Sequence, residues 1–121
     1  MNVADLKSKN PAIRRKALLA LGPKSIPMLK KFLGHDPSAV IRHEAAFLLG
    51  ATESEEAVKY LIHAIKTDKS NLVRHEAIEA LGDLGVSSPQ ALHLLQRLTR
   101  SKVAFIKETA EIASETLKIK Q

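Results

Sequence analysis

The sequence contains no cysteine, no tryptophan and few aromatic residues of any kind. Without cysteine, neither a disulfide framework nor a thiolate metal site can form. Aromatic residues make up 3% of the chain and hydrophobic residues 45%, so the core must be built from Leu, Ile, Val and Ala. The lack of cysteine also fits a reducing compartment, and we expect an intracellular, cytoplasmic protein.

Long hydrophobic runs are missing as well. No stretch approaches the roughly 18 apolar residues that a membrane-spanning helix needs, and the beginning, "MNVADLKSKNP", lacks the apolar segment of a secretory signal. A chain of 121 residues is long enough for one domain with its own core. We therefore expect a single domain with no membrane partner.

Acidic residues are scarce near the N-terminus. Residues 1–33 hold eight Lys or Arg and one Asp, whereas the rest of the chain holds 11 basic and 12 acidic residues. The net charge of +6 is therefore a local feature of the first unit. Such a patch could bind phosphates, through Arg14, Arg15, Lys16, Lys24, Lys30 and Lys31. The chain lacks the aromatic residues that stack on bases, which disfavours nucleic acid as a partner but leaves it open.

One ten-residue pattern occurs four times without gaps. The copies read "IRRKALLALG", "IRHEAAFLLG", "VRHEAIEALG" and "IKETAEIASE", and they start at Ile13, Ile41, Val73 and Ile106, at intervals of 28, 32 and 33 residues. The second position is always Arg or Lys and the fifth is always Ala. A repeat of this length is typical of a helical solenoid.

Each unit reads as two helices. The first carries apolar residues at helical spacing (Ile41, Ala45, Leu48 and Leu49 in the second unit), and we expect it to end at Gly22, Gly50 or Gly82. The linkers "HDPSA" and "KSN" hold residues that cap helices. The sequence predicts an all-α superhelix of three and a half to four helix pairs in one domain. Its units span about 1–35, 36–68, 69–101 and 102–121, and the last keeps only a long first helix.

The third and fourth positions of the pattern read Arg15-Lys16, His43-Glu44, His75-Glu76 and Glu108-Thr109. With the flanking "RHEA" and "LG", this resembles the HEAT-like repeats of phycobilisome lyases and, most of all, one half of deoxyhypusine hydroxylase. The likeness extends over nearly the whole chain. In each half of that enzyme family the two middle repeats carry His-Glu, as they do here, but the second half is missing from this sequence.

Elementary geometry limits what the two His-Glu pairs can do. Neighbouring residues on a helix point about 100° apart, so His43 and Glu44 do not face one ion together. Equivalent positions on stacked helices come closer, because helix axes pack about 8–10 Å apart. We therefore expect His43 and His75 to converge on one metal ion that takes its carboxylate from elsewhere. Two His and one carboxylate are the ligand set of non-haem Fe(II) oxygenases.

The resemblance implies a role for each of these residues. His43 and His75 would bind Fe(II), and Glu44 would bind the iron held mainly by the other subunit of a homodimer, giving a di-iron centre. Glu76 would receive the amine of the substrate, as the catalytic residue. The reaction would be O₂-dependent hydroxylation of a deoxyhypusine side chain on a translation factor, which is a protein substrate.

A second interpretation stays open. Duplication alone would copy a solvated helix face, so the chain equally fits a non-catalytic scaffold that binds a protein, or an accessory protein of the bilin-lyase type. His35, His63 and His93 share no column of the repeat and are predicted to lie on the surface. The run "ESEEA" at 53–57 is predicted to start a helix. Phe47 is predicted to serve packing.

Overall fold

The fold is entirely helical over the residues described by the computed structural model, which are 3–85 and 88–120. In chain order the elements are η1 (Val3–Lys7), α1 (Pro11–Leu21), α2 (Ile26–His35), α3 (Ala39–Ala51), η2 (Glu55–Ala57), α4 (Val58–Thr67), α5 (Asn71–Leu84), α6 (Pro89–Leu98) and α7 (Ala104–Lys120), where η marks a short 3₁₀-helix. The prediction of an all-α protein is confirmed.

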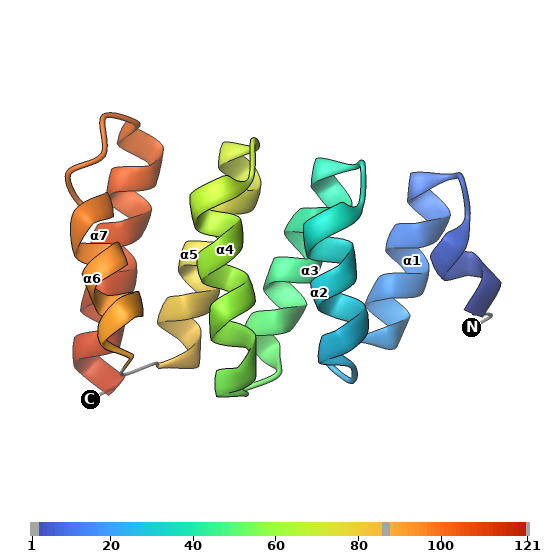
Figure 1. Cartoon of the computed structure of the whole chain (residues 1–121), viewed down its shortest axis with the longest axis horizontal. Coiled ribbons are helices and arrows are strands. Elements are labelled where there is room, and N and C mark those ends of the chain that lie inside the picture. Colours follow the sequence, from blue (N-terminus) through green and yellow to red (C-terminus); the bar gives the residue numbers. More distant parts are fainter. Residues whose placement is uncertain (1–2, 86–87, 121) are drawn as a thin grey trace.

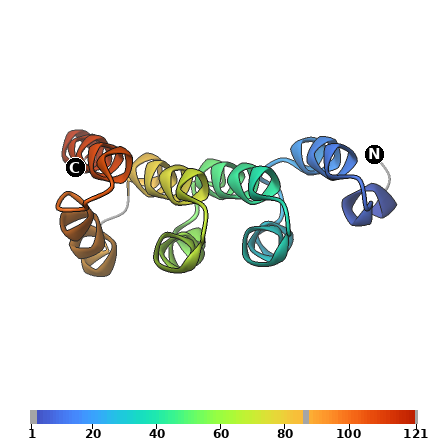
Figure 2. The same ribbon diagram turned by 90° about the horizontal axis from the view of Figure 1, so that it is seen from above.

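The helices form two layers along an extended stack. One layer contains α1, α3, α5 and α7, and the other contains η1, α2, α4 and α6 (Figure 2). The two ends of the chain lie at opposite ends of the stack (Figure 1). Each helix pair follows the previous one in space as it does in sequence, so the predicted solenoid is confirmed. The long helix α7 closes the C-terminal end without a described partner helix after it.

Serine side chains in the linkers start several of the helices. Ser38 Oγ accepts a hydrogen bond from the Ile41 N–H, and Ser70 Oγ does the same for Val73. Each hydroxyl satisfies one of the N–H groups that the first turn of a helix leaves unpaired. Ser54 caps η2, whose first turn is acidic, so the predicted helix start at "ESEEA" is confirmed.

The core is aliphatic, as the composition requires. Ile41, Ala45, Leu48 and Leu49, the apolar face predicted for the second unit, are all buried. Phe47 is different, because its side chain is 50% exposed and does not belong to the buried core. The packing role predicted for Phe47 is therefore wrong. Its position in the repeat points away from the second layer of helices.

Two glycines have a role that the sequence did not predict. Gly50 and Gly82 lie inside α3 and α5 and do not end these helices. A Cβ on Gly50 would stand 2.8 Å from the Cβ of Ala80, and one on Gly82 would stand 3.2 Å from that of Ala113. The missing side chains let α3, α5 and α7 approach one another closely. Only the expectation for Gly22 holds, since its φ of 64° ends α1.

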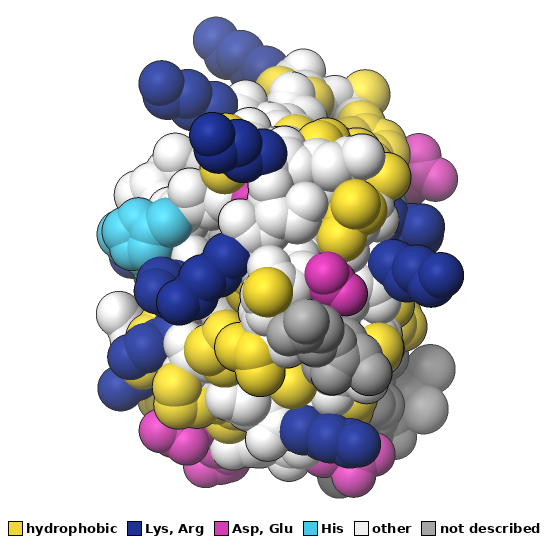
Figure 3. Space-filling view, turned by 90° about the vertical axis from the view of Figure 1, so that its right-hand side faces the viewer, with side chains coloured by type: hydrophobic (Ala, Val, Ile, Leu, Met, Phe, Trp, Pro, Cys, Tyr) yellow, Lys and Arg dark blue, Asp and Glu magenta, His cyan; other side chains and the backbone are white. Residues whose placement is uncertain are grey.

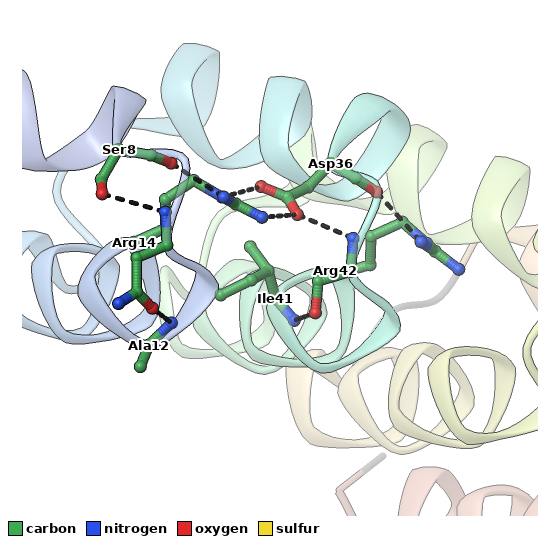
Figure 4. Close-up of polar contacts among 8 residues, drawn as sticks. Ser8, Ala12, Arg14, Asp36, Ile41 and Arg42 are labelled. Carbon is green, nitrogen blue, oxygen red and sulfur yellow. Dashed lines mark hydrogen bonds and ion pairs between the residues drawn. The ribbon is translucent and has the colours of Figure 1, made fainter.

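The second position of the repeat forms an arginine row, made up of Arg14, Arg42 and Arg74. Arg14 Nε and Nη2 donate to the two carboxylate oxygens of Asp36 at 2.9 and 3.1 Å, and Nη1 donates to the Ser8 carbonyl (Figure 4). These side chains are buried, and Asp36 Oδ1 also accepts from the Ser38 N–H at 2.9 Å. One carboxylate thereby fixes α1 and the start of α3 at the same time.

The same arrangement occurs one unit later. Arg42 donates to both oxygens of Asp68 at 2.9 and 3.2 Å, and its Nη1 donates to the Asp36 carbonyl. Asp68 in turn accepts from the Ser70 N–H. Arg74 instead donates from Nε to the Ile65 carbonyl and from Nη1 to Asn71 Oδ1. The repeated Arg is thus a structural residue that joins consecutive units.

Candidate functional site

The third and fourth positions of the repeat form a second row of contacts, on the layer of α1, α3, α5 and α7. In every step the third residue of one unit meets the fourth residue of the next. The pairs of this contact row are Arg15 Nη2 with Glu44 Oε1 at 2.9 Å, His43 Nε2 with Glu76 Oε1 at 3.1 Å, and His75 Nδ1 with Thr109 Oγ1 at 2.7 Å.

This offset of one position decides which predicted site residues come together. His43 meets Glu76, because the close approach of α3 and α5 brings the third position of one helix to the fourth of the other. Glu44 is held by Arg15, from the preceding unit. His75 turns towards Thr109 of α7. The four predicted residues therefore lie on one row but divide among three separate contacts.

The His75 imidazole is the most closely surrounded of the histidines in this row. Its Nε2 lies 3.2 Å from Glu79 Oε1, one helical turn along α5. Its ring stacks on Phe105 of α7, with ring centroids 4.4 Å apart and planes inclined by 24°. Neither Glu79 nor Thr109 is among the site residues predicted from the sequence. The i,i+4 spacing of His75 and Glu79 was the available signal for the first.

Glu76 is the buried carboxyl of the row, with 9% of the residue exposed. The pKa of Glu76 is raised from its usual 4.5 to about 7, mainly by burial, then by the neighbouring carboxylate of Glu79, which also shares a hydrogen bond with it, and by Asp83 and Glu44. A carboxyl with a pKa near neutrality can both give and take a proton at neutral pH. This is the environment of a group suited to proton transfer or to a cationic ligand.

Comparison with known proteins identifies the repeat. The sequence model of HEAT repeats matches residues 26–115. This chain belongs to the HEAT-repeat family. The likeness also extends to particular HEAT-repeat proteins, all of them longer than this one.

The relatives of this HEAT-repeat chain include deoxyhypusine hydroxylases. It is 38% identical to the one from Aspergillus clavatus over 82 residues, which is 67% of this chain and 24% of the relative. It is 39% identical to the one from Danio rerio over 83 residues, or 68% and 27%. The chain thus spans about a quarter of the length of these relatives. The resemblance seen in the sequence is confirmed.

A solved structure supports the same relationship. The human deoxyhypusine hydroxylase, solved in complex with glycerol, superposes with a TM-score of 0.80 at 31% sequence identity. The match covers 93% of this chain and 40% of the human one. The HEAT-repeat fold described above is therefore similar to that of part of the human protein.

The donor atoms of the contact row suit a divalent metal of the iron or zinc type. Imidazole nitrogens and carboxylate oxygens are the ligands that non-haem iron sites use. The structure supplies them as pairs, His43 with Glu76 and His75 with Glu79. No three His, Asp or Glu side chains of residues 3–85 and 88–120 surround a point that could hold a metal ion. Each pair is thus an incomplete ligand set that needs a further group.

Two rows of exposed apolar side chains border the contact row. One row consists of the residues just before the ten-residue pattern, and the other of the residues at its seventh position. On a helix these positions lie about one turn before and one turn after the third and fourth positions. Their members are 40–58% exposed and are Val40, Leu72 and Phe105 on one side, and Leu19, Phe47 and Ile112 on the other. We call them the apolar borders. Exposed apolar side chains gathered on one face mark an interaction surface.

The remaining predicted features lie outside this face. His35, His63 and His93 are exposed, as predicted. Lys and Arg side chains spread over the N-terminal end of the stack, among hydrophobic ones (Figure 3). Three of the six residues considered for phosphate binding have partners within the chain, since Arg14 forms an ion pair with Asp36, Arg15 bonds Glu44, and Lys30 Nζ donates to the Tyr60 hydroxyl at 3.4 Å. None of the helices in the described ranges is long and apolar enough to cross a membrane.

Proposed function

We propose that this HEAT-repeat protein is a deoxyhypusine hydroxylase-like, iron- and O₂-dependent hydroxylase of a modified lysine on a protein, assembled from two half-length chains in the cytoplasm. The observation that carries the proposal is the pair of His-Glu doublets on adjacent helices of one exposed face, in a chain 93% of which superposes on human deoxyhypusine hydroxylase. Each chain would be one repeat domain. The active site would lie between two of them.

His43 and His75 would hold the Fe(II), which activates O₂ when bound. Glu44 would complete the coordination of the iron held mainly by the other subunit, giving a di-iron pair across the dimer. For this Glu44 must leave Arg15, with which it forms a partly exposed ion pair. Exposed ion pairs contribute at most about 1 kcal/mol to the free energy of unfolding, so moving Glu44 from Arg15 to the metal costs little. Glu76 would receive the amine of the substrate, because a cation beside this buried carboxyl favours its charged form.

The charges of the face support a twofold dimer. At the third position, unit one carries Arg15 and unit four carries Glu108, both exposed. A twofold axis that places unit two of one chain over unit three of the other also places unit one over unit four. Arg15 of one chain would then face Glu108 of the other. Twofold interfaces are self-complementary in this way. The apolar borders would supply the buried apolar area of the same interface.

Native mass spectrometry tests the proposal. The protein is purified without chelator and supplied anaerobically with Fe(II). We expect a dimer with two irons that is lost in the His43→Ala and His75→Ala variants and kept in His63→Ala, which removes an exposed histidine of α4. A wild-type protein that stays monomeric and free of iron would contradict the proposal.

The second candidate is a non-catalytic scaffold that binds a protein through the same face. The exposed apolar borders favour it, because they need no metal to bind a partner. Two variants separate the candidates. Phe47→Ser should weaken partner binding under either, whereas His43→Ala should matter only if a metal is bound.

A further inference from the structure

The two histidines of the contact row differ in how their rings are held. His75 Nδ1 lies 2.7 Å from Thr109 Oγ1, and the same hydroxyl donates to the Phe105 carbonyl at 2.7 Å. A threonine hydroxyl has a single hydrogen to donate. With that hydrogen assigned to the carbonyl, the oxygen accepts from His75. The His75 Nδ1 therefore carries a hydrogen.

A hydrogen on Nδ1 determines the state of the other ring nitrogen, Nε2. In a neutral imidazole with its hydrogen on Nδ1, the lone pair is on Nε2. The stacked ring of Phe105 fixes the plane of the His75 imidazole, and Nε2 then points to Glu79 Oε1 at 3.2 Å. Two acceptors facing each other need a cation or a proton between them. The geometry thus prepares Nε2 as the ligand atom.

His43 has no such support. Its Nε2 contacts Glu76, and no side chain or carbonyl within the described ranges hydrogen-bonds to its Nδ1. The residue in the place of Phe105 one unit earlier is Leu72, which cannot stack as an aromatic ring does. The residue in the place of Thr109 is Glu76 itself. The hydroxyl that fixes a ring therefore occurs once, in the last unit.

We infer that Thr109 is a positioning residue that fixes the tautomer of His75 and so selects Nε2 as its metal-binding nitrogen. This inference rests on the proposed metal-binding function and assigns α7 a part in it. Groups that hydrogen-bond the other nitrogen of a metal-binding histidine set its tautomer and orientation, and losing one typically weakens metal binding about 10- to 100-fold. Thr109 is buried, and within the described ranges its hydroxyl hydrogen-bonds only to His75 and the Phe105 carbonyl, which fits this role.

The first test needs no metal. The nitrogen NMR shifts of His75 are measured in the metal-free protein at a pH where the imidazole is neutral. In the wild type the hydrogen should sit on Nδ1. Thr109→Val, which keeps the shape and removes the hydroxyl, should shift the hydrogen to Nε2 or leave both tautomers populated. Thr109→Ser should retain the wild-type tautomer, because it keeps the oxygen.

Thr116→Val is the matched control. Thr116 lies on the same helix, and its hydroxyl donates to the Ile112 carbonyl four residues back, but no histidine of the described residues hydrogen-bonds to it. This variant removes a hydroxyl of the same kind and should leave His75 unchanged. A His75 tautomer unaffected by Thr109→Val would overturn the inference. If the Thr109→Val chain fails to fold, the comparison of Thr109→Ser with Thr109→Ala decides the matter.

The second test adds Co(II) as a spectroscopic probe of the site. Thr109→Val should weaken Co(II) binding about 10- to 100-fold, while Thr109→Ser and Thr116→Val bind as the wild type does. Equal Co(II) affinity in the wild type and Thr109→Val would overturn the inference and leave the metal function standing. A wild type that binds no Co(II), together with a tautomer that still responds to Thr109→Val, would count against the metal function and support the assignment of Thr109 to His75.

Discussion

The arginine row and the contact row occupy neighbouring positions of the same repeat, but their side chains vary to different degrees from unit to unit. In the arginine row the chemistry is the same in the first two units, where Arg14 and Arg42 are each bound by two bonds to a largely buried aspartate, and it changes at Arg74, which bonds the Ile65 carbonyl. In the contact row the geometry repeats while the chemistry changes, from an ion pair to an imidazole-carboxyl contact and then to an imidazole-hydroxyl contact.

The difference separates scaffold from candidate site. A buried ion pair must be kept whole, because removing one partner leaves a charge without compensation. A row at the exposed face has no such constraint, so its residues can take up another task. The positions that keep their geometry and change their side chains are therefore where function is to be sought in this repeat.

The largest effect is expected from Asp68→Ala. This change removes the carboxylate that accepts two hydrogen bonds from Arg42 and one from the Ser70 N–H at the start of α5. Breaking a fully buried ion pair from one side lowers the free energy of unfolding by about 3–5 kcal/mol, and this pair, with Arg42 17% and Asp68 7% exposed, should come close to the lower figure. Denaturant unfolding measures it. A loss below about 1 kcal/mol would mean that the arginine row is no more structural than a surface ion pair.

The second prediction concerns Glu76 and pH in the metal-free protein. Its pKa of about 7 lies above the usual value of 4.5, so the native state binds more protons than the unfolded state between these values. The free energy of unfolding therefore falls as pH rises through this window. The carboxyl is surrounded by His43 and Glu44 of α3 and by Glu79 and Asp83 of its own helix.

Glu76→Gln, which is neutral at every pH, should remove this part of the pH dependence. Above pH 7 it should make the metal-free protein more stable than the wild type, by at most about 3 kcal/mol. Urea titrations at a series of pH values measure the difference, with Glu111→Gln on the exposed side of α7 as the control. Parallel curves for the wild type and Glu76→Gln would contradict the prediction.

The third prediction compares two glycines. Gly50→Ala forces a Cβ to within 2.8 Å of that of Ala80, so α3 and α5 must move apart. Overpacking of this kind costs about 1–3 kcal/mol, and the shift should also loosen the contact of His43 with Glu76. Gly34→Ala in α2 is the control, because nothing lies within 4 Å of its Cβ. Thermal unfolding of both variants measures the effect, and equal stabilities would show that the packing of α3 on α5 does not depend on this close approach.

The sequence predicts the fold because the repeat carries its own helix periodicity. Ile41, Ala45, Leu48 and Leu49 are buried as their spacing indicates. The sequence pattern misplaces the ends of α3 and α5, because a glycine inside a helix cannot be distinguished by sequence from a glycine that ends one. Only the distance to Ala80 shows that Gly50 serves contact between helices.

The site is predicted less completely, because its contacts depend on the register between neighbouring helices. The sequence places His43, Glu44, His75 and Glu76 in one pair of columns, and the structure does align these columns on one face. The offset by which His43 meets Glu76 depends on how far each helix is shifted along its neighbour, which no residue pattern encodes. Thr109 was overlooked because the resemblance concerned only the units that carry His-Glu.

The smallest effect on stability is expected from Glu44→Gln, which removes the one ion pair of the contact row. Arg15 is half exposed in this pair, so its loss should change the free energy of unfolding by less than about 1 kcal/mol. The proposed function gives the same change a larger effect elsewhere, because the carboxylate of Glu44 would complete the metal site of the other subunit. Denaturant unfolding and iron content are measured on one preparation, with Glu53→Gln as a control outside the row. A large loss of stability would place Glu44 with the arginine row, whereas unchanged stability with loss of iron would assign it to the site.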